Sequence, residues 1–233
     1  MQMSNFKKLL FDADDTLLDF KVGEEEALKL VFQEYGYPFN HEIANSYERI
    51  NMELWRQFEQ GKIDRDTVIY SRFGLLFQEI GVQDDGIAFE DCYQELLGMQ
   101  HFLIDGAIDL VERLSKDYDL YIVTNGVTRT QLRRLKDSGL DRYMRRIFVS
   151  EETGYQKPKM EFFDYCFARI PEFDPSKALI IGDSLSSDIR GGNNAGIATC
   201  WFNPMKVKNT SDVVIDYEIE KLSQIYDILG ITS

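Results

Sequence analysis

Residues 9–17 have the sequence Leu9-Leu10-Phe11-Asp12-Ala13-Asp14-Asp15-Thr16-Leu17, in which an apolar run ends directly in acidic residues. An apolar run this short, bounded by polar residues, is typical of a strand buried on both faces. Similar runs follow at residues 120–123, 147–149, 178–181 and 197–201, with a weaker one at residues 213–215. Between most of them, apolar periodicity predicts helices at residues 108–114, 128–135, 160–170 and 186–195. Strands that alternate with helices in this way predict an α/β fold with a doubly wound parallel sheet.

The stretch from residue 19 to residue 99 interrupts this alternation. It contains no comparable strand run, and its helical periodicity is broken at three glycine-containing sites into about four helices. We therefore predict a helical domain of residues 19–99, inserted into an α/β core formed by residues 1–18 and 100–233.

The composition is that of a folded, acidic protein. The chain has 233 residues, 44% of them hydrophobic, and its 40 acidic and 26 basic residues give a formal net charge of −14. This charge repels polyphosphates and anionic lipid surfaces, so we expect neither a nucleic-acid polymer nor a membrane as a partner. No apolar stretch approaches the roughly 18 residues of a membrane-spanning helix, and the N-terminus lacks a signal-peptide pattern. These features predict a cytoplasmic protein.

A second acidic cluster follows the predicted strand at residues 178–181. Asp183 stands at the end of that strand, and Asp188 lies in the first turn of the next predicted helix. Taken alone, a pair such as Asp12 and Asp14 could simply cap a turn. Because strand ends in a doubly wound sheet meet at one crevice, we expect all four carboxylates to lie together. Carboxylates this close repel one another unless a hard cation such as Mg²⁺ neutralises them, and the His and Cys ligands of a zinc site are absent from both segments.

Two further predicted loops carry groups suited to a phosphate. Thr124 and Asn125 follow the predicted strand at residues 120–123 and offer a hydroxyl and backbone N–H groups before a helix. Lys157 precedes Pro158, which disfavours helical geometry at the lysine and starts the next helix. Its ammonium group could reach the acidic cluster. Taken singly, the two loops are equally compatible with an ordinary turn and a surface lysine.

Together, these segments resemble the four sequence motifs of the haloacid dehalogenase superfamily of phosphohydrolases. The matching positions, in chain order, are Asp12 with Asp14, then Thr124, then Lys157, then Asp183 with Asp188. The resemblance covers essentially the whole chain and implies a Rossmann-like core, with the inserted helices as the superfamily's α-helical cap. It also implies a small-molecule phosphomonoester as the substrate and Mg²⁺ as the cofactor.

A closer resemblance is to the bacterial pyrimidine 5′-nucleotidase branch of that superfamily. The segments that carry it are residues 11–17, 51–55, 61–63, 72–73, 150–154 and 194–201. Members of that branch dephosphorylate pyrimidine nucleoside monophosphates and their non-standard analogues, so the resemblance implies dUMP, dTMP and UMP as substrates. Asp15 departs from the glycine that the wider superfamily often has there. Acidic residues occur at that position within the branch, and turn geometry is the simplest role for it.

The resemblance also implies a role for each motif residue. Asp12 would attack phosphorus to form an aspartyl-phosphate, and Asp14 would protonate the leaving oxygen and then activate water. The residues that would hold Mg²⁺ are Asp12, Asp14 through its backbone carbonyl, Asp183 and Asp188. Those that would bind and orient the phosphate are Thr124, Asn125 and Lys157. Because a dehalogenase needs no acid two residues after its nucleophile, Asp14 favours phosphoryl transfer.

Three alternatives stay open at this point. The chain could be a phosphatase for another small metabolite, such as phosphoglycolate or a sugar phosphate. A phosphomutase would have the same core motifs. A binding or regulatory protein could keep the fold without turnover, although the intact pair of Asp12 and Asp14 disfavours this.

Several other residues have two competing interpretations. Side chains in or near the inserted segment could contact a pyrimidine or form the segment's own core; they are Phe20, Tyr47, Trp55, Phe58 and Arg72. The three glutamates at residues 24–26 are expected to form an exposed first helical turn, and the arginine pairs at residues 133–134 and 145–146 are expected to face solvent.

Overall fold

The computed structural model describes residues 5–231, and the chain divides into two compact units. One unit holds the chain up to Phe20 and again from His101, and the other, here called the helical unit, consists of Lys21–Gln100. In the described residues, no helix is both long enough and apolar enough to cross a membrane. That the helical unit acts as a cap stays a prediction.

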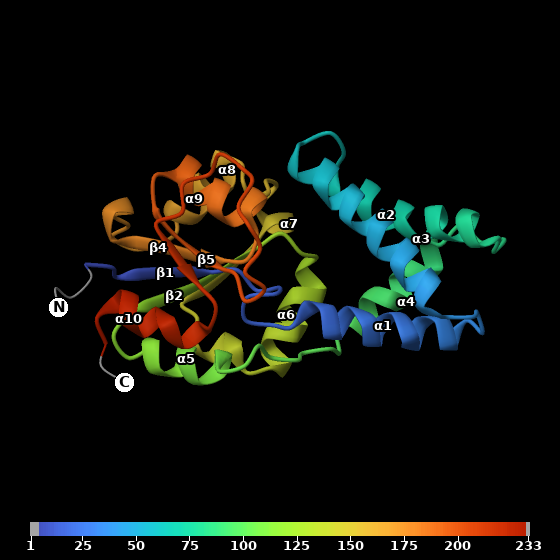
Figure 1. The fold of residues 1–233 in the computed structure, drawn as a ribbon, viewed down its shortest axis with the longest axis horizontal. Coiled ribbons are helices and arrows are strands. Elements are labelled where there is room, and N and C mark those ends of the chain that lie inside the picture. The colour runs from blue at the N-terminus through green and yellow to red at the C-terminus, as the bar shows by residue number, and fades with distance from the viewer. Residues whose placement is uncertain (1–4, 232–233) are drawn as a thin grey trace. The chain divides into compact units, whose positions relative to one another are not determined.

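The first unit is built on a six-stranded sheet with the strand order β3-β2-β1-β4-β5-β6 (Figure 1). The strands are β1 (Lys8–Phe11), β2 (Asp119–Thr124), β3 (Arg146–Val149), β4 (Ala178–Gly182), β5 (Ala198–Phe202) and β6 (Tyr217–Ile219). All neighbouring strands pair in parallel. Together with the helices on both faces, this confirms the predicted α/β fold with a doubly wound parallel sheet.

Helices cover both faces of the sheet (Figure 1). They are α5 (Ala107–Leu114), α6 (Thr128–Asp137), α7 (Ser150–Thr153), α8 (Met160–Phe167), α9 (Arg190–Ala195) and α10 (Ile225–Leu229). Single turns of 3₁₀-helix lie at Leu140–Tyr143, Pro175–Lys177 and Leu222–Gln224. Along β1, Leu9 and Phe11 pack with residues of α5 and α10, whereas Leu10 packs with residues of α8. Both faces of this strand are buried, which explains its uninterrupted apolar sequence.

The register of the sheet brings three polar strand ends to one edge. Phe11 at the end of β1 pairs with Ile122 of β2 on one side and with Ile181 of β4 on the other. The residues that follow these strands therefore emerge at about the same level. The strand order also reverses at β1, and such a switch point is where open α/β sheets bind ligands.

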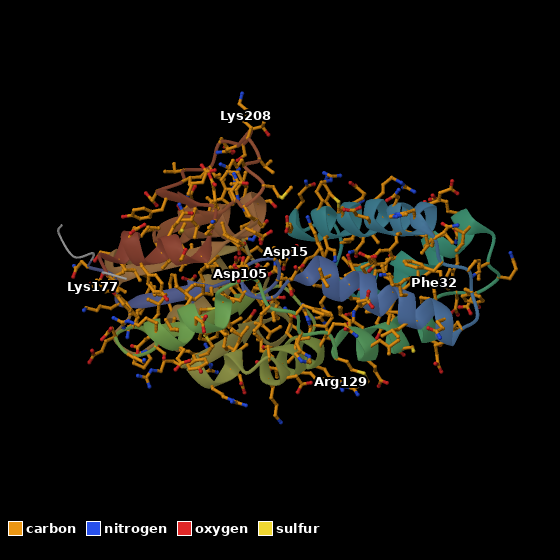
Figure 2. The ribbon with its side chains drawn as sticks, turned by 60° about the horizontal axis from the view of Figure 1, so that its bottom comes forward. Asp15, Phe32, Asp105, Arg129, Lys177 and Lys208 are labelled. Atoms are coloured by element: carbon orange, nitrogen blue, oxygen red, sulfur yellow. The ribbon has the colours of Figure 1, made fainter. Side chains whose placement is uncertain are left out.

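The described residues of the second unit form four helices. They are α1, which begins in the first unit (Phe20–Glu34), α2 (His41–Glu59), α3 (Arg65–Ile80) and α4 (Ile87–Leu97). The side chains of Asn40 and Asp64 cap the first turns of α2 and α3, and Gly81 ends α3 with a φ of 76°. The core of the unit is aromatic. Phe32 packs edge-on against Phe89 with ring centroids 5.0 Å apart, and Figure 2 shows Phe32 among the helices.

The prediction of a strand at residues 213–215 is wrong, because the sixth strand is β6, which begins at Tyr217. Asn193 on α9 accepts a hydrogen bond from the N–H of Val214 at 2.8 Å and donates one to its carbonyl at 2.9 Å. Since this side chain satisfies both backbone groups, the segment needs no neighbouring strand. Val214 itself is 64% exposed.

Candidate active site

Lys157 lies between two carboxylates at the edge of the sheet where the strands end. Its ammonium group donates to Asp12 Oδ1 at 2.8 Å, to Asp188 Oδ1 at 2.6 Å and to the carbonyl oxygen of Val123 at 2.7 Å. The side chain is 1% exposed, and these contacts match the three protons of an ammonium group. The structure thus places this lysine inside the acidic cluster and not on the surface.

The loop after β2 fixes the backbone of Lys157. The side-chain amide of Asn125 accepts a hydrogen bond from the N–H of Lys157 and donates one to its carbonyl. Asn125 therefore has a structural contact that the sequence did not indicate. Its expected contact with phosphate stays a prediction, and it would use the backbone N–H groups of the loop.

Three carboxylates converge beside this lysine. Asp12, Asp183 and Asp188 offer oxygens that all lie within 4.8 Å of one another. Asp12 follows β1 and Asp183 follows β4. Asp188 lies in a π-helical turn, Leu185–Ile189, which replaces the start of the helix predicted at residues 186–195.

The carboxylate of Asp188 is held by the backbone around it. The N–H of Ser184 donates to Asp188 Oδ2 at 3.1 Å. On the other side, a Cβ atom at residue 182 would collide with the carboxylate, so only glycine leaves room for it. Gly182 thus has a steric role at the end of β4.

Burial and mutual repulsion make it unfavourable for all three carboxylates to be ionised when no cation is bound. Burial, and next the Asp188 carboxylate, raise the pKa of Asp12 to about 8 against the opposing effect of Lys157. Burial and the carboxylates of Asp188 and Asp12 also raise the pKa of Asp183 well above its ordinary value. Although burial opposes it, the same carboxylates raise the pKa of Lys157, so this side chain stays an ammonium.

The donor set fits Mg²⁺. When ionised, the three carboxylates and the one ammonium group carry a summed charge of −2, which a divalent cation balances. All the side-chain donors are carboxylate oxygens, the ligand type that Mg²⁺ prefers. A cation there would also favour the ionised form of Asp12.

The side chain of Asp14 lies outside the three-carboxylate group and binds two residues of α6. Arg134 Nη1 donates to Asp14 Oδ1 at 2.5 Å, and Gln131 Nε2 donates to Asp14 Oδ2 at 2.8 Å. The same Gln131 amide donates to Thr124 Oγ1 at 2.8 Å. Two of the predicted site residues, Asp14 and Thr124, are therefore linked through Gln131, a residue whose role the sequence pattern did not indicate.

The prediction that Arg134 faces solvent is wrong. Its side chain is 1% exposed, whereas the neighbouring Arg133 is exposed as expected. Helix α6 turns a largely polar face inward and leaves Leu132 exposed, because the acceptors that Gln131 and Arg134 need lie on the buried side. The available signal in the sequence was that this helix has too few apolar residues to cover a sheet.

Asp15 has the geometry of a turn residue. Its φ is 53°, its N–H donates to the carbonyl of Leu18 at 2.8 Å, and its carboxylate accepts from the N–H of Phe20 at 3.2 Å. Aspartate adopts this left-handed conformation more readily than most residues. These contacts favour the structural interpretation of Asp15.

In the helical unit, most candidate pyrimidine contacts belong to the unit's own core. Tyr47, Phe58 and Arg72 are buried, and the guanidinium group of Arg72 pairs with the carboxylate of Glu90 at 2.6 Å. Among the named aromatic residues, Trp55 on α2 and Phe20 at the start of α1 are the ones left partly exposed.

The expectation of an exposed turn at residues 24–26 is wrong for Glu24. This carboxylate accepts hydrogen bonds from Tyr47 Oη at 3.2 Å, Asn51 Nδ2 at 3.2 Å and Tyr93 Oη at 3.4 Å. Helix α1 begins at Phe20, so Glu24 lies in its second turn and faces α2. A cavity of about 450 Å³, formed by residues of the helical unit, is lined by Glu24 and Tyr47 among others.

Residues 9–202 match the family model described as haloacid dehalogenase-like hydrolase. The chain is 49% identical to the HAD-hydrolase YfnB of Bacillus subtilis, over 98% of this chain and 97% of that protein. It is 40% identical to the pyrimidine 5′-nucleotidase PynA of Streptococcus pneumoniae (96% and 95% covered) and 30% identical to the pyrimidine 5′-nucleotidase YjjG of Escherichia coli (95% and 96% covered). A crystal structure of YfnB bound to magnesium matches with a TM-score of 0.93 over 97% of this chain and 99% of that chain.

Proposed function

The chain belongs to the haloacid dehalogenase-like hydrolase family, and we propose that it is a Mg²⁺-dependent phosphatase for pyrimidine nucleoside 5′-monophosphates. The observation that carries the proposal is the contact of Asp12 with Lys157 beside Asp183 and Asp188, with Asp14 two residues after Asp12. A nucleophile, a buried cationic side chain and a second acid are the groups that a two-step phosphoryl transfer needs.

The two steps assign a different task to each aspartate. Asp12 attacks phosphorus and the bond to the nucleoside oxygen breaks, while Asp14 gives its proton to that oxygen. The product is an aspartyl-phosphate and a free nucleoside. Asp14 then takes a proton from water, whose oxygen attacks the phosphorus, so that inorganic phosphate leaves and Asp12 is restored.

The remaining groups would bind and orient the phosphate. Lys157, already an ammonium beside Asp12, would neutralise charge on the transferring oxygens, and Thr124 would donate its hydroxyl. Asp12, Asp183 and Asp188, with the backbone carbonyl of Asp14, would hold Mg²⁺. When bound, the ion supplies charge neutralisation to the transferring group.

The choice of a pyrimidine nucleotide is supported by the two relatives named pyrimidine 5′-nucleotidases, which are covered almost over their whole length. Trp55 and Phe20 are partly exposed aromatic side chains of the kind on which a base stacks. The competing substrates are small phosphorylated metabolites without a base, such as phosphoglycolate or a sugar phosphate.

A panel of phosphomonoesters tests the proposal. The purified protein is assayed with dUMP, dTMP, UMP, phosphoglycolate and several sugar phosphates, with Mg²⁺ and with a chelator. We expect the pyrimidine nucleotides to have the highest kcat/KM and the chelator to abolish turnover. Sugar phosphates ranking above all three nucleotides would contradict the nucleotidase proposal, and no hydrolysis of any ester would contradict the phosphatase proposal.

A further inference from the structure

We propose that Arg134, acting with Gln131, is a positioning residue that holds the Asp14 carboxyl group in the orientation needed for its proton transfers. This inference rests on the proposed function, in which Asp14 is the acid and base. Both Arg134 and Gln131 lie on α6, a helix of the core that carries no residue expected to touch the substrate or the metal.

The first observation is that both oxygens of the carboxyl group are held. Arg134 donates to Oδ1 of Asp14 and Gln131 donates to Oδ2, at 2.5 and 2.8 Å. Arg134 Nη1 also donates to Oε1 of Gln131 at 2.8 Å, so the two donors fix each other. A carboxyl group held at both oxygens cannot rotate about its bond to Cβ without breaking a contact.

The second observation is the distribution of burial in this ion pair. The arginine side chain is 1% exposed, whereas the Asp14 side chain is 27% exposed. Each carboxyl oxygen has two lone pairs, so one donor on each leaves a position for a proton on the open side. The contact therefore orients Asp14 without blocking its exchange of protons.

The third observation is the close packing around Gln131. A Cβ atom at Gly126 would lie 2.5 Å from Cγ of Gln131, so the glycine leaves room for this side chain. The same amide donates to the hydroxyl of Thr124. One amide group thus fixes two parts of the site: the carboxyl group of Asp14, and the loop that is expected to bind phosphate.

Burying an arginine is costly, which argues against a purely stabilising role. Removing a guanidinium group from water is unfavourable, and a buried ion pair often stabilises a fold no better than apolar side chains of similar volume. The guanidinium group lies 5.2 Å from the ring centroid of Phe20, which compensates part of this cost. A role in orienting Asp14 explains why this polar contact is built at the site.

The proposal predicts a kinetic signature that depends on the leaving group. A nucleoside alkoxide is strongly basic and needs a proton from Asp14, whereas p-nitrophenolate leaves without one. The value of kcat/KM reports steps up to the irreversible formation of aspartyl-phosphate. Misplacing Asp14 should therefore lower kcat/KM for the nucleotide and spare it for p-nitrophenyl phosphate. Hydrolysis of the shared intermediate also needs Asp14, so kcat should fall for both substrates.

The test compares Arg134→Met with the matched control Arg133→Met, the exposed neighbour on the same helix, using dUMP and p-nitrophenyl phosphate with saturating Mg²⁺. For Arg134→Met we expect kcat/KM for dUMP to fall about 100-fold and that for p-nitrophenyl phosphate to fall less than about threefold. Arg133→Met should stay within about twofold of the wild type for both. Arg134→Lys keeps the charge without the planar fork and should recover part of the loss.

Two further variants keep the proposal falsifiable. Gln131→Leu removes the contacts with both Asp14 and Thr124, so it should lower kcat/KM for both substrates, and by the larger factor for dUMP, even if Arg134→Met does not fold. Asp14→Asn tests the proposed function separately, because it should show the split at about 10²–10⁴-fold. Asp14→Asn without the split would contradict the acid–base role of Asp14, whereas a split in Asp14→Asn alone would overturn only the role of Arg134. Equal losses for both substrates in the folded Arg134 and Gln131 variants would also overturn it.

Discussion

Asn125 holds Lys157 by both of its backbone polar groups: Asn125 Oδ1 accepts from the lysine N–H at 2.9 Å, and Asn125 Nδ2 donates to the lysine carbonyl at 3.0 Å. The pairing resembles one step of a β-ladder made by a side chain. It joins the loop after β2 to the segment that carries the buried lysine, 32 residues later in the chain. The residue that Asn125 holds is therefore the one whose ammonium group lies between Asp12 and Asp188.

Asn125→Ala should therefore reduce activity about 100-fold, because a small displacement of a charged group at the reacting atoms is costly. It should also lower the free energy of unfolding by about 1–3 kcal/mol, since two partly buried backbone groups lose their partners. Asn209→Ala is the matched control, because Asn209 also accepts a backbone N–H but lies in an exposed loop. Equal activity of both variants would contradict the role of Asn125.

Asp12→Asn should abolish turnover, with a loss of about 10⁴-fold or more, because an amide is no nucleophile toward phosphorus. Asp15→Asn is the control, since asparagine tolerates the φ of 53° and retains an acceptor for the N–H of Phe20. We expect it to retain at least a third of the wild-type rate. Circular dichroism is used to check that both variants are folded. Activity of Asp12→Asn near that of the wild type would refute the role of Asp12 as the nucleophile.

Binding of Mg²⁺ should weaken as the pH falls below about 8. Without the ion, the pKa of Asp12 is raised to about 8 and that of Asp183 is raised as well, so the metal must displace protons. Each displaced proton lowers the apparent affinity by up to about tenfold per pH unit in this range. Isothermal titration calorimetry between pH 6 and pH 9 measures the affinity for Mg²⁺, and two buffers of different ionisation enthalpy report the protons released on binding. An affinity that does not change with pH would contradict it.

The metal-free protein should lose stability as the pH rises from about 4 to about 8. The folded chain keeps a proton on Asp12 up to about pH 8, whereas the unfolded chain releases it near 3.8. In this window the folded state binds more protons than the unfolded state, so the free energy of unfolding falls with rising pH. Between pH 6 and pH 8 the loss from this group is about 2 kcal/mol. Urea unfolding in chelator should show a weaker pH dependence for Asp12→Asn, and an identical dependence would contradict the assignment.

Trp55→Ala should raise KM for dUMP about tenfold and leave KM for p-nitrophenyl phosphate nearly unchanged, since stacking on a base contributes about 1–3 kcal/mol. Tyr47→Phe is a control for indirect effects of the helical unit, because it changes a buried side chain in the same helix, α2. A rise in KM for both substrates alike would show that Trp55 does not contact the base.

Sequence patterns were sufficient for strands β1 to β5 and for the polar residues that follow β1, β2 and β4. The apolar run that ends in Asp12 and the one that ends in Asp183 predict strands whose ends meet, and the structure brings these carboxylates within reach of one ion. Topology alone gives this result, because parallel strands in a doubly wound sheet have their carboxyl ends at one edge.

The roles of Gln131 and Arg134 on α6 could not be predicted, because they depend on contacts with residues far away in the chain and not on strand topology. Amphipathic patterns place arginine outside, and nothing local to residue 134 indicates an acceptor 120 residues earlier in the chain. The misplaced strand at residues 213–215 has the same origin, since the side chain of Asn193 satisfies that backbone from another element. In both cases long-range polar contacts outweigh the local pattern.

Gly182 is uncharged, yet it determines where one charged group of the site, the Asp188 carboxylate, can lie. The space that a methyl group would take at this residue is the space in which the Asp188 carboxylate lies. One added carbon at the end of β4 would leave every ionisable group of the cluster in the chain and displace the Asp188 carboxylate, which accepts a hydrogen bond from the ammonium group of Lys157. The positions of the carboxylates thus depend on the absence of a side chain at residue 182 as much as on electrostatics. A substitution of Gly182 by an uncharged residue would therefore perturb an ionic site.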